Sequence, residues 1–244
     1  MKYLSLYIVI IMLSSCSGQQ KDDCLTSMGD IVSLDRDVSG FDKLYVEDRI
    51  KVVLIQDSTQ YGRIELNGPS NLLDQIESNV SNKQLRLVNR NTCNFVRSFN
   101  YEIKIIVYIK ELTGLHIESI AEVVSNDTIN IGFLNILHPA LSDIKLILSG
   151  DEVFIQSRNS AKTILEGNLR VLKGSIEEIS DLNSEHLICE EVYIDSHSPL
   201  DCYVNATKGM YMNIHNSGNI FYLNEPSEYK ILANRTGSGQ LIKK

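Results

Sequence analysis

The fold is decided by Leu134-Asn135-Ile136 and Val153-Phe154-Ile155, two copies of an apolar-x-apolar unit that lie 19 residues apart. From residue 115 to residue 231 the steps between successive copies are 19, 19, 16, 23, 20 and 17 residues. The remaining copies are Leu115-His116-Ile117, Leu169-Arg170-Val171, Val192-Tyr193-Ile194, Met212-Asn213-Ile214 and Tyr229-Lys230-Ile231. A repeat at a nearly fixed period is typical of stacked supersecondary units that share one core.

The repeat predicts an all-β fold, a parallel β-helix or β-solenoid with a short N-terminal β-rich segment that contains one short helix. A chain that returns to the same position on each turn lays equivalent strands side by side in parallel, about 4.8 Å apart. Glycines suit the corners of such a coil because they tolerate positive φ. The expected corner glycines are Gly150, Gly167, Gly174, Gly218, Gly237 and Gly239. The alternative, an antiparallel sandwich, would repeat hairpins rather than whole turns.

The steps of 16 and 23 residues, on either side of the copy that contains Val171, depart from the period of about 19. They predict a shortened turn followed by an insertion, which makes residues 172–191 the segment least tied to the scaffold.

Before the repeat, residues 40–112 read as short strands at 50–55, 63–66, 84–88 and 101–109. Alternating polar and apolar residues are typical of half-buried strands. Residues 69–79 are the best helix candidate, with Ser70 or Asn71 as the cap. Asn67-Gly68 has the composition of a hairpin turn.

The N-terminus carries a targeting segment over residues 1–15. Lys2 precedes an apolar stretch over residues 3–13, which is too short to span a bilayer, since spanning takes roughly 20 apolar residues. The following Leu13-Ser14-Ser15-Cys16 resembles the bacterial lipobox. The resemblance implies that Cys16 becomes the first mature residue and carries lipid, so that the membrane is a partner through this anchor. A plain signal peptide with an incidental cysteine is the alternative.

Residues 16–39 are expected to form a lipid-anchored flexible tether, followed by a single solenoid domain over residues 40–244. Its N-terminal strands would span 40–112 and its repeat turns 113–244. Polar residues behind Cys16 would keep the domain away from the membrane surface. Within the tether, Gln20-Lys21-Asp22-Asp23 resembles a surface-export signal of Bacteroidetes lipoproteins, although an ordinary linker fits equally well.

The chain is acidic, with 23 Lys and Arg against 31 Asp and Glu in 244 residues, a net charge of −8. This charge argues against nucleic acid as a partner, because phosphate backbones are bound by clustered Lys and Arg. Apart from Cys16, the cysteines are Cys24, Cys93, Cys189 and Cys202. An even number in an exported chain permits two disulfides in three connectivities, and free thiols are the alternative.

The sequence resembles the head GIN domain family, exported proteins of Bacteroidetes described as heads of autotransporter adhesins. The likeness covers about residues 40–244. It rests on Phe41-x-x-Leu44-x-Val46, residues 81–87, residues 216–226 and Gly237-Ser238-Gly239. The corners at 118–121, 138–141 and 196–199 depart from the family's Gly-Ser-Gly pattern. The resemblance implies a β-helical extracellular domain without established catalysis.

Chemistry-bearing residues are scattered, so we expect no catalytic residue, no metal and no cofactor. Paired carboxylates on adjacent turns could act on a glycoside. The acidic candidates are Asp143, Asp151, Glu152, Glu177, Glu178, Asp181 and Asp201. The histidines His116, His138, His197 and His215 lie at different offsets from the repeat unit, which predicts no single ladder. The outward residues Tyr193, Tyr203 and Tyr211 are a candidate ligand face.

The expected function is that of a lipid-anchored, non-enzymatic module of the outer membrane, at the periplasmic face or the cell surface. It would act as a structural or adhesion-type surface for a glycan or protein ligand. The alternatives are a carbohydrate-active enzyme on a β-helix and a scaffold or accessory subunit of an envelope complex.

Overall fold

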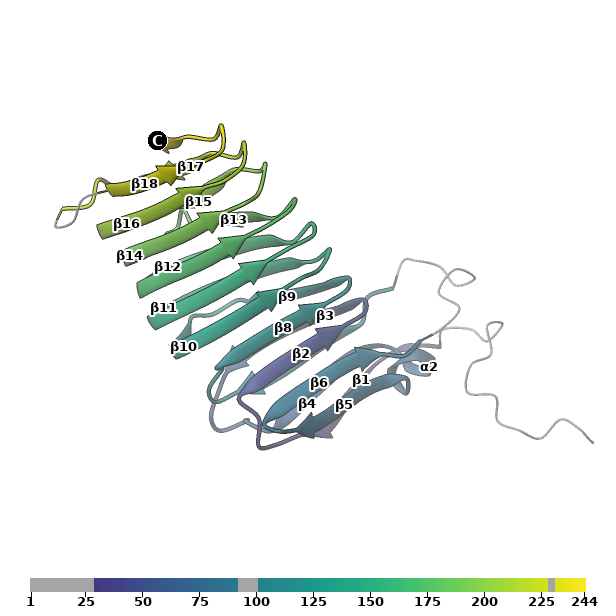
Figure 1. Ribbon diagram of the computed structural model, residues 1–244. Helices are drawn as coiled ribbons and strands as arrows, with labels where there is room; N and C mark the ends of the chain where they lie inside the picture. The colour runs from purple at the N-terminus through teal and green to yellow at the C-terminus, as the bar shows by residue number, and fades with distance from the viewer. Residues whose placement is uncertain (1–28, 92–100, 228–230) are drawn as a thin grey trace, which may run out of the picture.

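The chain forms a β-solenoid of about 6 turns with one short helix (Figure 1). The computed structural model describes residues 29–91, 101–227 and 231–244. The first strands are β1 (Ile31–Asp37), β2 (Lys43–Glu47), β3 (Ile50–Gln56), β4 (Arg63–Pro69), β5 (Ile76–Ser81), β6 (Gln84–Asn89) and β7 (Lys104–Ile109). The next are β8 (Gly114–Glu118), β9 (Ala121–Ser125), β10 (Ile129–His138), β11 (Asp143–Ser157), β12 (Lys162–Ile176) and β13 (Asp181–Asn183). The last are β14 (Leu187–Ser196), β15 (Cys202–Val204), β16 (Ala206–Ile214), β17 (Ile220–Tyr222), β18 (Ile231–Arg235) and β19 (Leu241–Lys243).

Two parallel stacks of strands make up the walls. The front sheet contains β6, β2, β8, β10, β14, β16, β18 and the second halves of β11 and β12, which run side by side in Figure 1. The back sheet contains β7, β3, β9, β13, β15, β17, β19 and the first halves of β11 and β12. Because β11 and β12 each continue from one sheet into the other, every turn is one unit of the same coil. The predicted solenoid is therefore confirmed.

The core is a set of apolar ladders that run along the coil axis. Leu134, Val153, Leu172, Val192 and Met210 are register partners in successive front strands, and each has no exposed surface. Burying one such side chain contributes about 1.5–3 kcal/mol. Each turn therefore gains most of its stability from the turns on either side of it.

The strand register shows that the predicted insertion at residues 172–191 is wrong. Ile155 pairs with Gly174, and Gly174 pairs with Ile194, so the equivalent unit of β12 is Leu172-Lys173-Gly174. The steps here are 19 and 20 residues, and the segment completes β12 and continues through β13 into β14. Gly174 interrupts the apolar pattern and lies inside a strand, not at a corner.

The space left by Gly174 explains why the sequence pattern failed there. A Cβ at this position would lie 3.0 Å from the Ile194 side chain and 3.4 Å from that of Ile155. The neighbouring turns thus fill a position that has no side chain of its own, and a pattern of apolar residues cannot reveal it.

The N-terminal strands are part of the same coil. β2 lies between β6 and β8, and β3 lies between β7 and β9, all in parallel. Antiparallel strands then cover this end, because β5 pairs with β6, and β4 pairs with β7 and β1. The tether expected to extend to residue 39 is corrected by β1, whose seven residues all pair with β4. Their side chains are mostly exposed, so no apolar pattern indicates this strand.

The helix is shorter than predicted, since α2 covers only Ser70–Leu73 and its N-cap position is Pro69, with no side-chain cap. Residues 76–81 form β5 instead of continuing the helix, and Asn67-Gly68 lies inside β4 instead of forming a hairpin turn. Pairing with neighbouring strands outweighs the local preference in both cases. No helix within the described ranges has the length and hydrophobicity needed to cross a membrane.

Gly150 and Gly167 occupy tight corners, as the sequence predicts. Their φ values are 143° and 110°, in the region that favours glycine. A Cβ on Gly150 would lie 1.9 Å from the Ile131 carbonyl oxygen, and one on Gly167 would lie 2.0 Å from that of Leu148. The backbone of one turn therefore rests directly on the backbone of the preceding turn.

Gly150→Ala is expected to lower the free energy of unfolding by about 3 kcal/mol or more, because it combines backbone strain with a clash against the preceding turn. Gly132→Ala is the matched control, since a Cβ there meets nothing within 4 Å. Its effect should stay within about 0.5 kcal/mol. Urea unfolding followed by circular dichroism measures both, and equal losses would contradict the proposed contact.

His138 is a polar side chain inside the core. It has no exposed surface, its Nε2 lies 2.6 Å from Ser142 Oγ, and its Nδ1 lies 3.2 Å from Thr163 Oγ1. Burial lowers the pKa of His138 from 6.5 to about 4. The folded state therefore holds this imidazole neutral between pH 6.5 and 4, while the unfolded chain takes up a proton.

The stability that His138 contributes should fall as the pH falls through this window. The loss between pH 7 and pH 5 is about 2 kcal/mol, because the unfolded state binds more protons there. Urea unfolding at the two pH values measures it. His138→Gln should flatten the pH dependence by this amount relative to the parent chain. Equal slopes in the two proteins would contradict the assignment.

Candidate functional site

Two columns of outward side chains line a groove on the front sheet. The aromatic column contains Phe154, Tyr193 and Tyr211, with Lys173 between the first two, and the polar column contains Ser175, Asp195 and Asn213. The groove between them has a volume of about 300 Å³, and Gly174 and Ile194 contribute to its floor. The strand register forms this site, because it places residues that lie about 19 positions apart in the sequence next to one another in each column.

Tyr193 and Tyr211 stack with ring centroids 4.5 Å apart and planes inclined by 5°. Tyr193 donates a hydrogen bond of 2.6 Å to Glu191 Oε2, and this bond raises the pKa of Tyr193 to about 12. Because the rings cover each other's faces, the groove is bordered by ring edges, which are the positive part of an aromatic quadrupole. Such an edge favours contact with electronegative oxygen atoms.

The structure brings only two of the three candidate tyrosines together. Tyr203 lies on β15 in the back sheet, where it stacks with Phe221 at 5.1 Å. Lys244 Nζ lies 5.2 Å from the centre of the same ring. Tyr203 therefore belongs to a separate aromatic pair on the other wall.

Two histidines that the sequence pattern does not place together lie side by side. The rings of His197 and His215 stack at 4.2 Å with planes inclined by 10°. Each follows a residue of the pair Ser196 and Ile214, which are register partners in β14 and β16. The sequence pattern gives these histidines different offsets because it places the repeat copy at residues 212–214, whereas the register partner of residues 192–194 is 210–212. Asp195 lies beside both rings.

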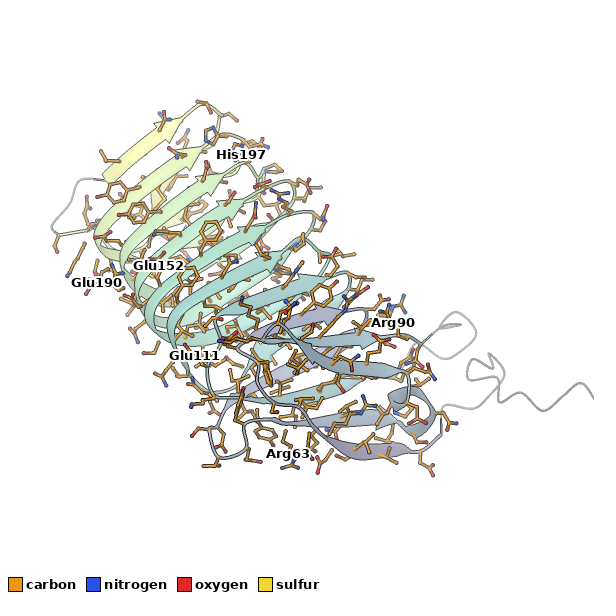
Figure 2. The ribbon with its side chains drawn as sticks, turned by 60° about the horizontal axis from the view of Figure 1, so that its bottom comes forward. Arg63, Arg90, Glu111, Glu152, Glu190 and His197 are labelled. Atoms are coloured by element: carbon orange, nitrogen blue, oxygen red, sulfur yellow. The ribbon has the colours of Figure 1, made fainter. Side chains whose placement is uncertain are left out.

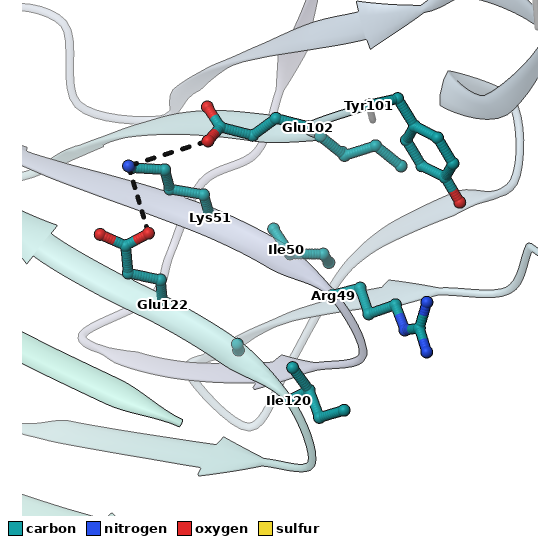
Figure 3. A pocket seen from close by; sticks show the side chains of 9 residues that line it. Arg49, Ile50, Lys51, Tyr101, Glu102, Ile120 and Glu122 are labelled. Carbon is teal, nitrogen blue, oxygen red and sulfur yellow. Dashed lines mark ion pairs between the residues drawn. The ribbon is translucent and has the colours of Figure 1, made fainter. Parts of the chain in front are cut away.

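A second pocket lies on the back sheet near the N-terminal strands (Figure 3). It has a volume of about 420 Å³, and Ile50, Ile120 and Tyr101 are among its lining residues. Lys51 Nζ lies 3.1 Å from Glu122 Oε2 and 3.8 Å from Glu102 Oε2, one carboxylate on each side. The hydrogen bond to Glu122 raises the pKa of Lys51. Lys51 and the two carboxylates that line this pocket thus form ion pairs with one another.

The candidate carboxylates face cations of neighbouring turns more often than they face each other. Glu152 Oε1 lies 2.8 Å from Lys173 Nζ, and Glu177 Oε2 lies 3.0 Å from Arg158 Nε. Asp151 forms an ion pair with Arg170. In Figure 2, Glu152 and Glu190 lie toward one end of the front-sheet strands, and His197 lies toward the other end. These pairs link successive turns.

The remaining carboxylates also have nearby partners. Glu178 accepts a hydrogen bond from the Asn159 backbone N–H at 2.7 Å, and Asp201 accepts one from the Asn219 backbone N–H at 2.8 Å. Asp143, Lys162 and Asp181 are register partners in consecutive back strands. Burial raises the pKa of Asp181, and the charge of Asp143 adds to this effect.

Cys189 and Cys202 are buried free thiols, which for these two is the alternative that the sequence left open beside disulfides. Cys189 lies in a ladder with Leu169 and Ala206 of the front-sheet strands, and Cys202 lies in a back-sheet ladder, so their registers separate them. Burial raises the pKa of both thiols to about 12. Cys16, Cys24 and Cys93 lie outside the described residues.

The comparison with protein families agrees with this geometry. The family described as "Putative auto-transporter adhesin, head GIN domain" matches residues 40–226. The chain belongs to this family. The resemblance noted in the sequence is therefore confirmed, and membership of the head GIN domain family suggests an adhesin-like protein of the cell surface or envelope. No protein with a curated description matches the chain.

Solved structures share the fold at low sequence identity. A "putative adhesin" from Bacteroides fragilis is 18% identical, with a TM-score of 0.75, and the match covers 88% of this chain and 97% of that one. A "putative adhesin" from Parabacteroides merdae is 15% identical, with a TM-score of 0.59 over 88% and 97% of the two chains. A "putative lipid binding protein" from Parabacteroides distasonis is 16% identical, with a TM-score of 0.57 over the same shares. These likenesses establish the common architecture.

Proposed function

We propose that this head GIN domain protein is a lipid-anchored, non-enzymatic adhesion module of the bacterial outer membrane, and that its front-sheet groove binds glycan. The proposal rests on one observation above all. An aromatic column and a polar column border the same groove, and Ser175, Asp195 and Asn213 supply hydroxyl, carboxylate and amide groups along it. A few fixed polar groups beside aromatic walls are typical of small-ligand sites.

The shape of the groove favours a ligand rich in hydroxyl groups. Its volume of about 300 Å³ is at the lower end of the range for small-molecule sites. Asp195 and Asn213 lie on adjacent turns, so donors and acceptors repeat along the coil axis. A chain of sugar residues has a matching linear arrangement of hydroxyls, whereas a flat protein surface would leave the floor of the groove unfilled.

Binding rather than catalysis is supported by the partners of the acidic side chains. Glycoside hydrolysis uses two carboxylates that flank one bond, about 5–10 Å apart, with one of them acting as a proton donor. Within the described ranges, Asp151, Glu152 and Glu177 each lie against a cation of an adjacent turn. Such ion pairs engage the carboxylates in contacts between successive turns, which suits a structural role.

Anchoring is supported by the lipobox-like Leu13-Ser14-Ser15-Cys16 and by the family of surface or envelope proteins to which the chain belongs. The polar tether behind Cys16 would hold the solenoid away from the bilayer, on the periplasmic face or at the cell surface.

A glycan array probed with the purified Cys16→Ser chain should give a defined set of ligands. Tyr211→Ala and Asn213→Ala should each weaken binding of the best ligand about 10-fold or more, which corresponds to about 1.4 kcal/mol. Tyr203→Ala is the matched control, because it removes an equally stacked ring from the back sheet. Absence of glycan binding, or equal losses in all three variants, would contradict the groove as the binding site.

Mass spectrometry of the mature protein should find lipid on Cys16 as the first residue. Cys16→Ala should abolish this modification and shift the protein from the membrane fraction to the soluble fraction. Cys24→Ala, eight positions further along, should leave both unchanged. An unmodified N-terminus, or membrane association that survives Cys16→Ala, would rule out the anchor.

A further inference from the structure

Three potential metal ligands converge where β14 and β16 end, on the same two turns that carry the stacked tyrosines. One ligand atom each from Asp195, His197 and His215 lies within 4.8 Å of both others. Asp195 Oδ1 is 2.9 Å from His215 Nε2 and 3.5 Å from His197 Nε2. The side chains are 48%, 49% and 29% exposed for Asp195, His197 and His215, so a hydrated ion can reach them.

Asp195 Oδ1 is an unsatisfied acceptor at the centre of this cluster. The atom itself is buried and has no hydrogen-bond partner among the described residues. The 2.9 Å contact with His215 Nε2 is short enough for a hydrogen bond but is not aligned as one. A buried carboxylate oxygen without a partner is costly, since desolvation of a polar group requires compensation. A cation between this oxygen and the two imidazoles would provide that compensation.

A neighbouring hydroxyl orients one of the imidazoles. His215 Nδ1 lies 2.7 Å from Thr236 Oγ1, on the next turn. When Nδ1 carries the proton and donates it to Thr236, Nε2 presents its lone pair toward Asp195. Metal-binding histidines are commonly held in this way by a hydrogen bond from the other ring nitrogen.

We propose that Asp195, His197 and His215 form a binding site for a divalent transition metal ion, with zinc as the reference ion. Two imidazole nitrogens and one carboxylate oxygen are donors that zinc accepts, at about 2.0–2.2 Å each. Three protein ligands leave at least one coordination position for water or for an external ligand. This site goes beyond the proposed glycan groove, because the imidazoles of His197 and His215 lie outside the groove lining.

The donor spacing suits a tetrahedral ion, although one imidazole ring has to turn. Donor atoms around a tetrahedral zinc ion lie about 3.4 Å apart at the usual bond lengths. The two contacts of Asp195 Oδ1, at 2.9 and 3.5 Å, are close to this value. The imidazole planes are nearly parallel, so one ring must turn out of the stack for both lone pairs to meet at one ion. His197 is about half exposed and can rotate into water at little cost.

The donor set also determines which ions the site excludes. Calcium takes six to eight oxygen ligands, and magnesium keeps an octahedral shell of oxygen atoms. The cluster supplies one carboxylate and two nitrogen donors, which suit zinc, copper or nickel. Elsewhere on the front sheet, His116 Nε2 lies 2.9 Å from Glu118 Oε2, with Tyr45 rather than a second imidazole against its ring. His116 therefore provides an internal comparison for a lone histidine beside a carboxylate.

The test is equilibrium dialysis of the full chain against Zn²⁺, Ni²⁺, Ca²⁺ and Mg²⁺, with bound metal measured by mass spectrometry. We expect zinc binding with a stoichiometric component that is absent for calcium and magnesium. His197→Gln and His215→Gln should each weaken that component 10-fold or more. Thr236→Val should weaken it less, as expected for a positioning residue. The cysteines are common to all variants, so differences between the proteins isolate this site.

His116→Gln is the matched control and should bind zinc as the parent chain does. Circular dichroism of each protein without metal checks that the fold is retained, and the spectrum of bound Co²⁺ provides a second readout. Its d–d bands should report nitrogen and oxygen coordination in the parent chain and should change in His197→Gln and His215→Gln. Zinc binding equal in the parent chain and in the double variant H197Q/H215Q would overturn the proposal, as would an equal loss in His116→Gln.

Discussion

The parallel backbone ladder between successive turns is the constraint on which the rest of the structure depends. Once Asp143 pairs with Lys162, the same step continues to the pair formed by Ser157 and Ile176. A shift of one residue would turn every apolar side chain outward, so the buried ladders and the hydrogen bonds enforce the same register. The corner glycines belong to this constraint, because Gly150 and Gly167 allow the backbones of adjacent turns to touch.

The outer surface follows from that register as directly as the core does. Side chains about 19 positions apart become neighbours within a column, and a column can hold stacked rings, ion pairs or metal ligands. Tyr193 meets Tyr211, Asp151 meets Arg170, and His197 meets His215 for the same geometric reason. The coil therefore converts a long sequence separation into direct contact, and small changes of register would exchange the partners.

The architecture could be predicted from the sequence because a repeated apolar unit determines a coil, whatever the partners of each residue are. Its details could not, because they depend on neighbours in other turns. The sequence does not reveal that Gly174 occupies a core position, because glycine has no side chain and the side chains of Ile155 and Ile194 fill the space. β1 is held by pairing with β4 and shows few buried side chains. The histidine pair was missed because the repeat copy near Met212 was placed two residues out of register, although both residues were visible in the sequence.

The two ends of the coil differ, and the difference affects how such a molecule can change in length. The antiparallel strands β1, β4 and β5 close the first end, while the turns behind them contact only their immediate neighbours. Duplication of one internal turn would leave both ends as they are and would add about 4.8 Å of height. It would also add one position to every outward column. The reach of the domain and the length of its groove can therefore evolve together, in steps of a single turn.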